Sequence, residues 1–246
     1  MKSQILSHHL RKALAVCALG IFWSTNAWAL CSDSLIESAK FPDGTVIPYM
    51  LTSGTQKPSY ALIVMPGGAG LLNPEMHDGK LSFQYQNNFL IRSRNLFCDN
   101  KFVVASTNAS TSEDRMEGII NDLKIRYPEA KICIVGTSRS TLSTIALSKP
   151  LDGKVSCIVH TASMTAISWL DTTKFKSRHL LVHHKEDGCK LTGYWGAEEN
   201  HKDYKTPLIT MEGGVTEGNP CEAFGYHGFN GIEKETVDKI KAWIAQ

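Results

Sequence analysis

KICIVGTSRSTLSTIALS, residues 131–148, is a short apolar run followed directly by a segment of helical character. Ser138 lies at the junction, two residues after Gly136 and two before Ser140. This G-x-S-x-small pattern is close to the G-x-S-x-G nucleophile elbow, a tight strand-to-helix turn that needs small residues on either side of the serine. Such pentapeptides are common, and serines also cap helices without any catalytic role. The surrounding sequence must therefore decide whether Ser138 is a nucleophile.

Short apolar runs recur on both sides of this stretch and alternate with longer amphipathic ones, which predicts a mostly parallel sheet flanked by helices. An antiparallel pair is expected first, at 34–41 and 46–53. The buried strands expected after it are 61–68, 101–107, 131–136, 155–162, 179–184 and 207–212. The expected helices lie near 86–97, 113–127, 139–148 and 231–246. This order predicts eight strands in a single domain and leaves no connection long enough for a large cap domain.

Residues 1–29 have the features of a secretory signal peptide. A basic stretch precedes the apolar run ALAVCALGIFW, and the segment ends in NAWA, which predicts cleavage after Ala29 and a mature domain at 30–246. The apolar run is about 11 residues long, whereas a membrane-spanning helix needs roughly 20. Bulky Leu30 before Cys31 argues against a lipoprotein. We therefore expect a periplasmic or secreted protein with no stable membrane insertion after cleavage.

The charge balance gives no indication of a nucleic-acid partner. The chain has 26 Lys and Arg against 24 Asp and Glu, but three of the basic residues and no acidic residue lie within 1–29. The remaining 23 basic and 24 acidic residues give a formal net charge of −1. The cysteines and histidines show no CxxC, HExxH or H-x-H spacing, so neither a metal nor another cofactor is expected.

A glycine-rich turn, PGGAG at 66–70, follows the predicted strand at 61–68. Its backbone N–H groups at Gly68 and Ala69, together with the N–H of Arg139, would hold the oxyanion of a tetrahedral intermediate. A flexible turn or a phosphate loop is the alternative interpretation, but G-x-x-x-x-G-K-[ST] does not occur. The turn therefore favours a catalytic role for Ser138.

Two further groups fall in the order that one mechanism requires. Asp187 follows the predicted strand at 179–184, and His227 lies between the last strand and the final helix. A serine hydroxyl becomes an effective nucleophile when an imidazole accepts its proton and a carboxylate holds that imidazole in one tautomer. We assign these roles to Ser138, His227 and Asp187, with Glu186 and Asp171 as alternative acids. Other roles are expected for three histidines: His160 in the core, and, at a strand end or on the surface, His183 and His184.

Six cysteines remain after signal cleavage, an even number that is typical of disulfide-bonded exported proteins. The first bridge expected joins Cys189 to Cys221, because the loops of Asp187 and His227 must meet. The second and third choices are Cys31 with Cys98 and, on adjacent predicted strands, Cys133 with Cys157.

Together these residues resemble the α/β-hydrolase superfamily, and within it small exported bacterial serine hydrolases. The segments that carry the resemblance are VMPGGAG, NNFLIRSRNLF, IVGTSRST, HHKEDGC and YHGFNGIE, which span nearly all of the mature chain in order. The resemblance implies the eight-stranded fold, a triad of Ser138, Asp187 and His227, and hydrolysis of an ester or related acyl bond in a small-molecule substrate. Ser140 departs from the family, which usually has glycine there. An acyltransferase with the same triad and an inactive binding protein of the same fold are the alternatives; neither substrate nor oligomeric state is predicted.

Overall fold

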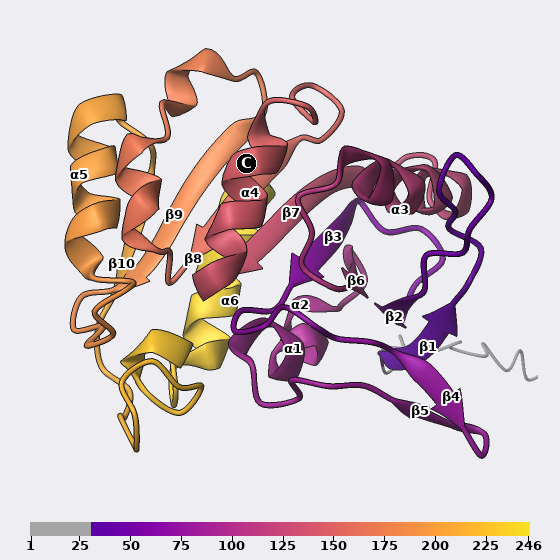
Figure 1. The fold of residues 1–246 in the computed structure, drawn as a ribbon, viewed down its shortest axis with the longest axis horizontal. Coiled ribbons are helices and arrows are strands. Elements are labelled where there is room, and N and C mark those ends of the chain that lie inside the picture. Colours follow the sequence, from indigo (N-terminus) through magenta and orange to yellow (C-terminus); the bar gives the residue numbers. More distant parts are fainter. Residues whose placement is uncertain (1–30) are drawn as a thin grey trace, which may run out of the picture.

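The computed structural model describes residues 31–246, so the predicted signal peptide lies outside the described residues. An eight-stranded sheet with the order β1-β2-β6-β3-β7-β8-β9-β10 forms its centre (Figure 1). The β1–β2 and β2–β6 pairs are antiparallel, and the other five neighbouring pairs are parallel. The prediction of an eight-stranded, mostly parallel sheet is confirmed.

The elements follow the predicted order closely. The strands of the main sheet are β1 Ser32–Ile36, β2 Tyr49–Ser53, β3 Tyr60–Met65, β6 Phe102–Ser106, β7 Lys131–Thr137, β8 Cys157–Thr161, β9 Arg178–His184 and β10 Leu208–Met211. The α-helices are α1 Phe89–Arg92, α2 Arg94–Phe97, α3 Glu113–Arg126, α4 Thr141–Ser148, α5 Tyr194–Tyr204 and α6 Glu233–Ile244. The 3₁₀ turns are η1 Ser138–Ser140, η2 Thr165–Trp169, η3 Thr172–Lys174 and η4 Tyr226–Gly228.

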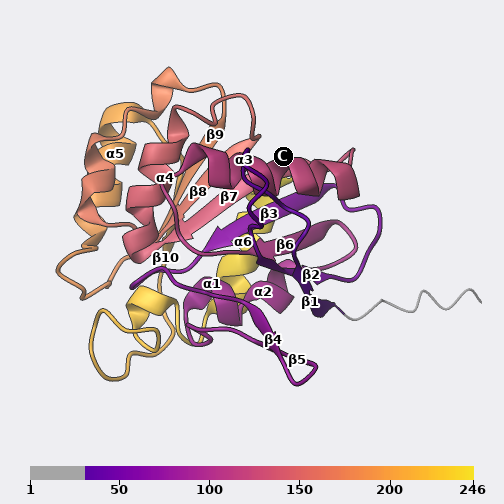
Figure 2. The ribbon, with the colours of Figure 1, turned by 45° about the vertical axis from the view of Figure 1, so that its right-hand side comes forward.

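Helices cover both faces of the sheet because successive side chains of a strand point to opposite faces and both sets are apolar here. Leu62 and Val64 of β3 pack in one core with α1, α2 and α6. Ala61 and Ile63 pack in the opposite core with α3 and α4. A smaller cluster joins α5 and η2 to β9. Figures 1 and 2 show this three-layer arrangement from two directions.

Parallel strands place their carboxyl ends at one edge of the sheet, where ligand sites of open α/β sheets collect. β3 leads there into the 66–70 turn and β7 into Ser138, while the loops after β9 and β10 carry Asp187 and His227. The connection from β8 to β9 contains only the short turns η2 and η3, so no large cap domain is inserted at this point.

Three elements differ from the sequence prediction. Helix α5 is additional; its buried residues are Gly196, Ala197 and Asn200, which give almost no apolar periodicity. The small hairpin of β4 (Glu75–His77) and β5 (Lys80–Ser82) is also additional. Its Asp-Gly turn has positive φ at both residues, a signal for a hairpin that was present in the sequence. The predicted helix at 86–97 is instead two single turns, α1 and α2, which are separated at Ser93.

All three expected disulfides are present: Cys31–Cys98, Cys133–Cys157 and Cys189–Cys221. The second joins register partners on β7 and β8. The third joins the loop after β9 to the loop that precedes η4. None of the helices within 31–246 is both long and apolar enough to cross a membrane.

Candidate active site

Ser138 occupies a sharp turn between β7 and α4. Its φ is +54°, a left-handed conformation that non-glycine residues rarely adopt. Strained backbone of this kind places the serine of a nucleophile elbow at the top of the sheet. The N-cap residue of α4 is Ser140, so Ser138 does not have the helix-capping role that was the alternative.

Small residues flank Ser138 because the turn brings backbone segments together. A Cβ at Gly136 would lie 2.6 Å from Thr144 Cγ2, so glycine is required there. Ser140 is buried and donates its hydroxyl hydrogen bond to the carbonyl oxygen of Pro66. The serine that replaces the usual glycine therefore fits and ties the elbow to the glycine-rich turn.

The glycine-rich turn lies directly against Ser138. A Cβ on Gly67 would come within 2.8 Å of the Ser138 Cβ. The N–H of Ala69, however, donates to Tyr85 Oη at 3.1 Å, so this predicted oxyanion donor already has a partner in the protein. The backbone N–H groups of Gly68 and Arg139 are left as candidates, and Arg139 lies in the first turn of η1, where N–H groups have no helical acceptor.

Asp187 and His227 are in direct contact. His227 Nδ1 lies 2.9 Å from Asp187 Oδ2, and both side chains are buried. The same carboxylate oxygen accepts a hydrogen bond from Thr192 Oγ1 at 3.0 Å, and Oδ1 accepts one from the N–H of Cys189 at 2.9 Å. Because Nδ1 faces the carboxylate, Nε2 of His227 is the nitrogen available to a substrate or nucleophile.

The surroundings of Asp187 keep it ionised. Burial by itself would raise its pKa, but hydrogen bonds from His183 and His227, the charge attraction of His227 and the Cys189 N–H lower the pKa well below the usual range. An anionic Asp187 fixes the His227 ring in one tautomer and would stabilise an imidazolium if His227 accepted a proton.

Neither alternative acid reaches His227. Glu186 is exposed, and its backbone N–H donates to His184. Asp171 instead accepts a hydrogen bond from Thr173 and pairs with Lys174 at 3.1 Å. The structure therefore brings Asp187, rather than Glu186 or Asp171, to the imidazole.

Sequence reasoning missed two groups around Asp187. Thr192 Oγ1 lies 3.0 Å from His227 Nδ1 and so contacts both members of the pair. His183 is at the end of β9, as expected, but it is buried rather than on the surface, with Nε2 2.7 Å from the Thr192 carbonyl oxygen and 3.3 Å from Asp187 Oδ2. A histidine four residues before the acid was the only available signal.

The other two histidines have structural contacts. His160 is fully buried and bonded to Thr144 Oγ1 at 2.8 Å and to His179 at 3.1 Å, which confirms its predicted place in the core. His184 lies at the end of β9, is buried, and has Nε2 2.8 Å from the Gly213 carbonyl oxygen.

Ser138 and His227 line one cavity of about 810 Å³. Half of the other residues described in its wall have neutral polar side chains, and Glu222 is the one acidic residue: Gly68, Gln84, Tyr85, Gln86, Asn87, Asn88, Phe89, Thr137, Cys221, Glu222, Ala223 and Gly228. The side chain of Arg139 is exposed and is not part of this wall. Within 31–246 no group of three or more His, Cys, Asp or Glu side chains is arranged to hold a metal ion.

Solved structures with the same architecture include α/β serine hydrolases. A serine hydrolase without a lid from Xanthomonas campestris matches 85% of this chain and 94% of its own, with a TM-score of 0.53 and 9% identity. The esterase domain of a Rhodothermus marinus protein matches 86% of this chain and 98% of its own, with a TM-score of 0.52 and 10% identity. The chain has the α/β-hydrolase fold.

The fold also occurs as part of larger proteins. A putative dipeptidyl aminopeptidase IV from Bacteroides ovatus matches 90% of this chain but 36% of its own, with a TM-score of 0.54 and 14% identity. No family model and no curated protein matches the sequence of this chain. Identities this low show the α/β-hydrolase fold alone, so the activity must be argued from the site.

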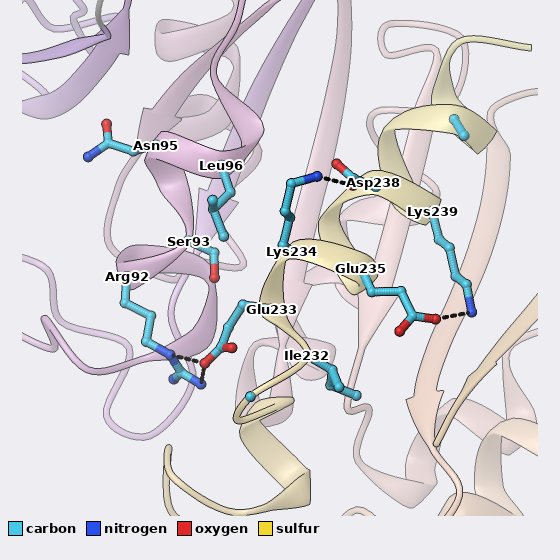
Figure 3. Close-up of a pocket in the computed structure, with 12 residues that line it drawn as sticks. Arg92, Ser93, Asn95, Leu96, Ile232, Glu233, Lys234, Glu235, Asp238 and Lys239 are labelled. Atoms are coloured by element: carbon cyan, nitrogen blue, oxygen red, sulfur yellow. Dashed lines mark hydrogen bonds and ion pairs between the residues drawn. The ribbon is translucent and has the colours of Figure 1, made fainter. Parts of the chain in front are cut away.

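A second, larger cavity of about 990 Å³ lies between α2 and the start of α6 in this α/β-hydrolase fold, and Ser138 and His227 are not part of its wall (Figure 3). Arg92 lies at its edge, paired with Glu233 at 2.9 Å. The same guanidinium donates to the carbonyl oxygens of Gly228 at 2.7 Å and Asn87 at 2.6 Å. Arg92 thus connects the His227 loop to the wall of the smaller cavity. We place the candidate active site in that smaller cavity, because Ser138 and His227 line it.

Proposed function

We propose that the protein is a serine hydrolase that cleaves an ester or related acyl bond. The observation that carries the proposal is the buried Asp187–His227 contact at 2.9 Å, because His227 lines a cavity whose wall also contains a serine at φ +54° on a strand-to-helix turn. An activated serine, an oriented imidazole and backbone donors in one water-accessible cavity are the parts that acyl transfer needs.

In the proposed reaction, Ser138 Oγ attacks the acyl carbon while His227 Nε2 accepts the hydroxyl proton. The negative oxygen of the tetrahedral intermediate lies against backbone N–H groups of the elbow and the glycine-rich turn. His227 then donates its proton to the leaving alcohol, and an acyl group remains on Ser138. A water molecule, deprotonated by His227, then attacks the acyl carbon, and the bond to Ser138 Oγ breaks as His227 returns the proton to this oxygen, which releases the acid and restores the serine.

The cavity wall supports a neutral substrate rather than an anionic one. Its described residues include neither lysine nor arginine, and Glu222 is the one carboxylate among them. Amide side chains at Gln84, Gln86 and Asn87 offer both donors and acceptors to a polar leaving group. An acyltransferase would use the same residues, so product analysis with and without an added alcohol acceptor is needed to separate the two activities.

The test is activity-based labelling with a fluorophosphonate, followed by peptide mapping. We expect the label on Ser138, and we expect Ser138→Ala to abolish it. Ser82→Ala, a change at an exposed serine of β5, is the matched control and should leave labelling unchanged. Labelling of Ser138→Ala at the wild-type rate would refute the proposal.

We also propose that the protein is exported and works in the periplasm or outside the cell. Three disulfides support this because thiols are kept reduced in most cytosols. Amino-terminal sequencing of the exported protein should begin at Leu30. A mature protein that still carries residues 1–29 would contradict the proposal.

A further inference from the structure

The hydroxyl of Tyr85 lies on the glycine-rich turn. It accepts a hydrogen bond from the Ala69 N–H at 3.1 Å. The ring covers Gly68 so closely that a Cβ there would lie 2.8 Å from Tyr85 Cε1. Tyr85 therefore occupies the Ala69 N–H predicted as an oxyanion donor, and its phenol hydroxyl lies beside this N–H.

The main chain holds Tyr85 in an unfavourable conformation. Its φ is +54°, although it has a bulky side chain. The neighbouring backbone is bonded on both sides, with the Tyr85 carbonyl accepting from the Asn88 N–H at 2.9 Å and the Gln84 N–H donating to Leu72 at 2.7 Å. Non-glycine residues in this region persist where the surroundings enforce it, and they cluster at functional sites.

The contact with Ala69 leaves the hydroxyl proton of Tyr85 unused. A phenol has one donor and two acceptor positions, and the Ala69 N–H occupies an acceptor position. A hydroxyl that accepts one hydrogen bond is polarised and donates the next more strongly. Tyr85 lines the same cavity as Ser138 and His227, so its proton is available to a group bound there.

We propose that Tyr85 is a catalytic residue, whose hydroxyl donates a hydrogen bond to the oxyanion of the tetrahedral intermediate in place of the Ala69 N–H. The inference rests on the proposed acyl-transfer function of Ser138. A fixed donor aimed at developing charge stabilises the transition state more than the bound substrate, so its loss lowers kcat and changes KM little.

Tyr85→Phe is the test, because it removes the hydroxyl and keeps the ring over Gly68. On an ester that the wild type hydrolyses, we expect kcat to fall by about 100-fold, as when other oxyanion donors are removed, and KM to stay within about twofold. The rate of fluorophosphonate labelling at Ser138 should fall as well, because that adduct also places an oxygen in the hole. Tyr60→Phe, which stacks on Phe102 away from the cavity, is the control and should behave as wild type.

Affinity for a boronic acid distinguishes a catalytic role of Tyr85 from a purely structural one, because a structural defect would not weaken the binding of this transition-state analogue selectively. The boronic acid forms a tetrahedral adduct on Ser138, and its affinity for the Tyr85→Phe variant should be lower than for the wild type by about the factor lost in kcat. The affinity of the product acid should be the same for both proteins. An unchanged kcat, or a loss confined to KM, would overturn the role of Tyr85. If the wild type is not labelled at Ser138 at all, the proposed function itself fails. If the wild type is labelled and Tyr85→Phe is labelled at the same rate, only the role of Tyr85 fails.

Discussion

Removal of the Cys189–Cys221 disulfide should reduce both stability and activity, because this bridge joins the loop of Asp187 to the loop that leads to His227. The two loops are already in contact, since a Cβ at Gly188 would lie 3.3 Å from Pro220 Cβ. The matched control is the Cys133–Cys157 disulfide, which lies within the sheet between β7 and β8. Two variants, each with both cysteines of one bridge replaced by alanine, separate the effect on stability from the effect on activity.

The expected loss of stability follows from the length of the loops. The sequence separation is 32 residues for Cys189–Cys221, and the chain-entropy model then gives about 3.7 kcal/mol. For Cys133–Cys157 the separation is 24 residues, which gives about 3.5 kcal/mol, and two buried sulfur atoms are lost as well. At about 2–4 °C per kcal/mol for a protein of this size, each variant should lose roughly 7–15 °C in Tm.

The activities should differ between the two variants. We expect kcat/KM of the Cys189→Ala, Cys221→Ala variant to fall about 10- to 100-fold, because the freed loops no longer hold His227 and Asp187 together. The Cys133→Ala, Cys157→Ala variant should stay within about threefold of wild type, because the strands on either side keep their ladder hydrogen bonds. Thermal unfolding and ester hydrolysis, measured where both variants are folded, provide the comparison. Equal losses of activity in the two variants would refute the reasoning.

Three further predictions concern the elbow, the acid and the buried histidines. Asp187→Asn should lower kcat by about 10⁴-fold with the fold intact by circular dichroism, and a near wild-type rate would show that another group orients the imidazole. Ser140→Gly should lower kcat/KM, because the turn loses its bond to Pro66, and steady-state kinetics identical to wild type would contradict this. Burial lowers the pKa of His179 from 6.5 to about 4, and the pKa of its partner His160 is lowered in the same direction. Below pH 6.5 the unfolded chain therefore binds more protons than the folded one. The free energy of unfolding should be at its full value above pH 6.5, and His179 should lower it by about 3 kcal/mol as the pH drops to 4, with His160 acting in the same direction. Urea unfolding across this range checks it, and a His179→Gln variant with the same slope as wild type would show that His179 is not responsible.

The sequence predicted the sheet because its signals are local. Most strands are short apolar runs that end at glycine, proline or a polar residue, and a helical segment was predicted in each of the three connections between 61 and 162. Strand number and order along the chain could therefore be inferred without contacts. The same reasoning failed for α5, where packing against η2 stabilises a helix that buries Gly196, Ala197 and Asn200 instead of an apolar stripe. It also failed at Ser93, where the predicted helix is interrupted.

The site divides in the same way. Ser138, Asp187 and His227 were inferred from their positions after strands, because the carboxyl ends of parallel strands converge at one edge of the sheet. The groups that surround them were not, since Tyr85, His183 and Thr192 reach the site through contacts between loops that no spacing encodes. The choice of Asp187 over Glu186 was also made in space, because only one of two adjacent carboxylates can be buried against the imidazole. The sequence by itself determined which candidate side chains follow which strands. The packing of the loops decided which hydrogen-bond donors and acceptors meet, because these contacts depend on distances between loops that exist only in the folded chain.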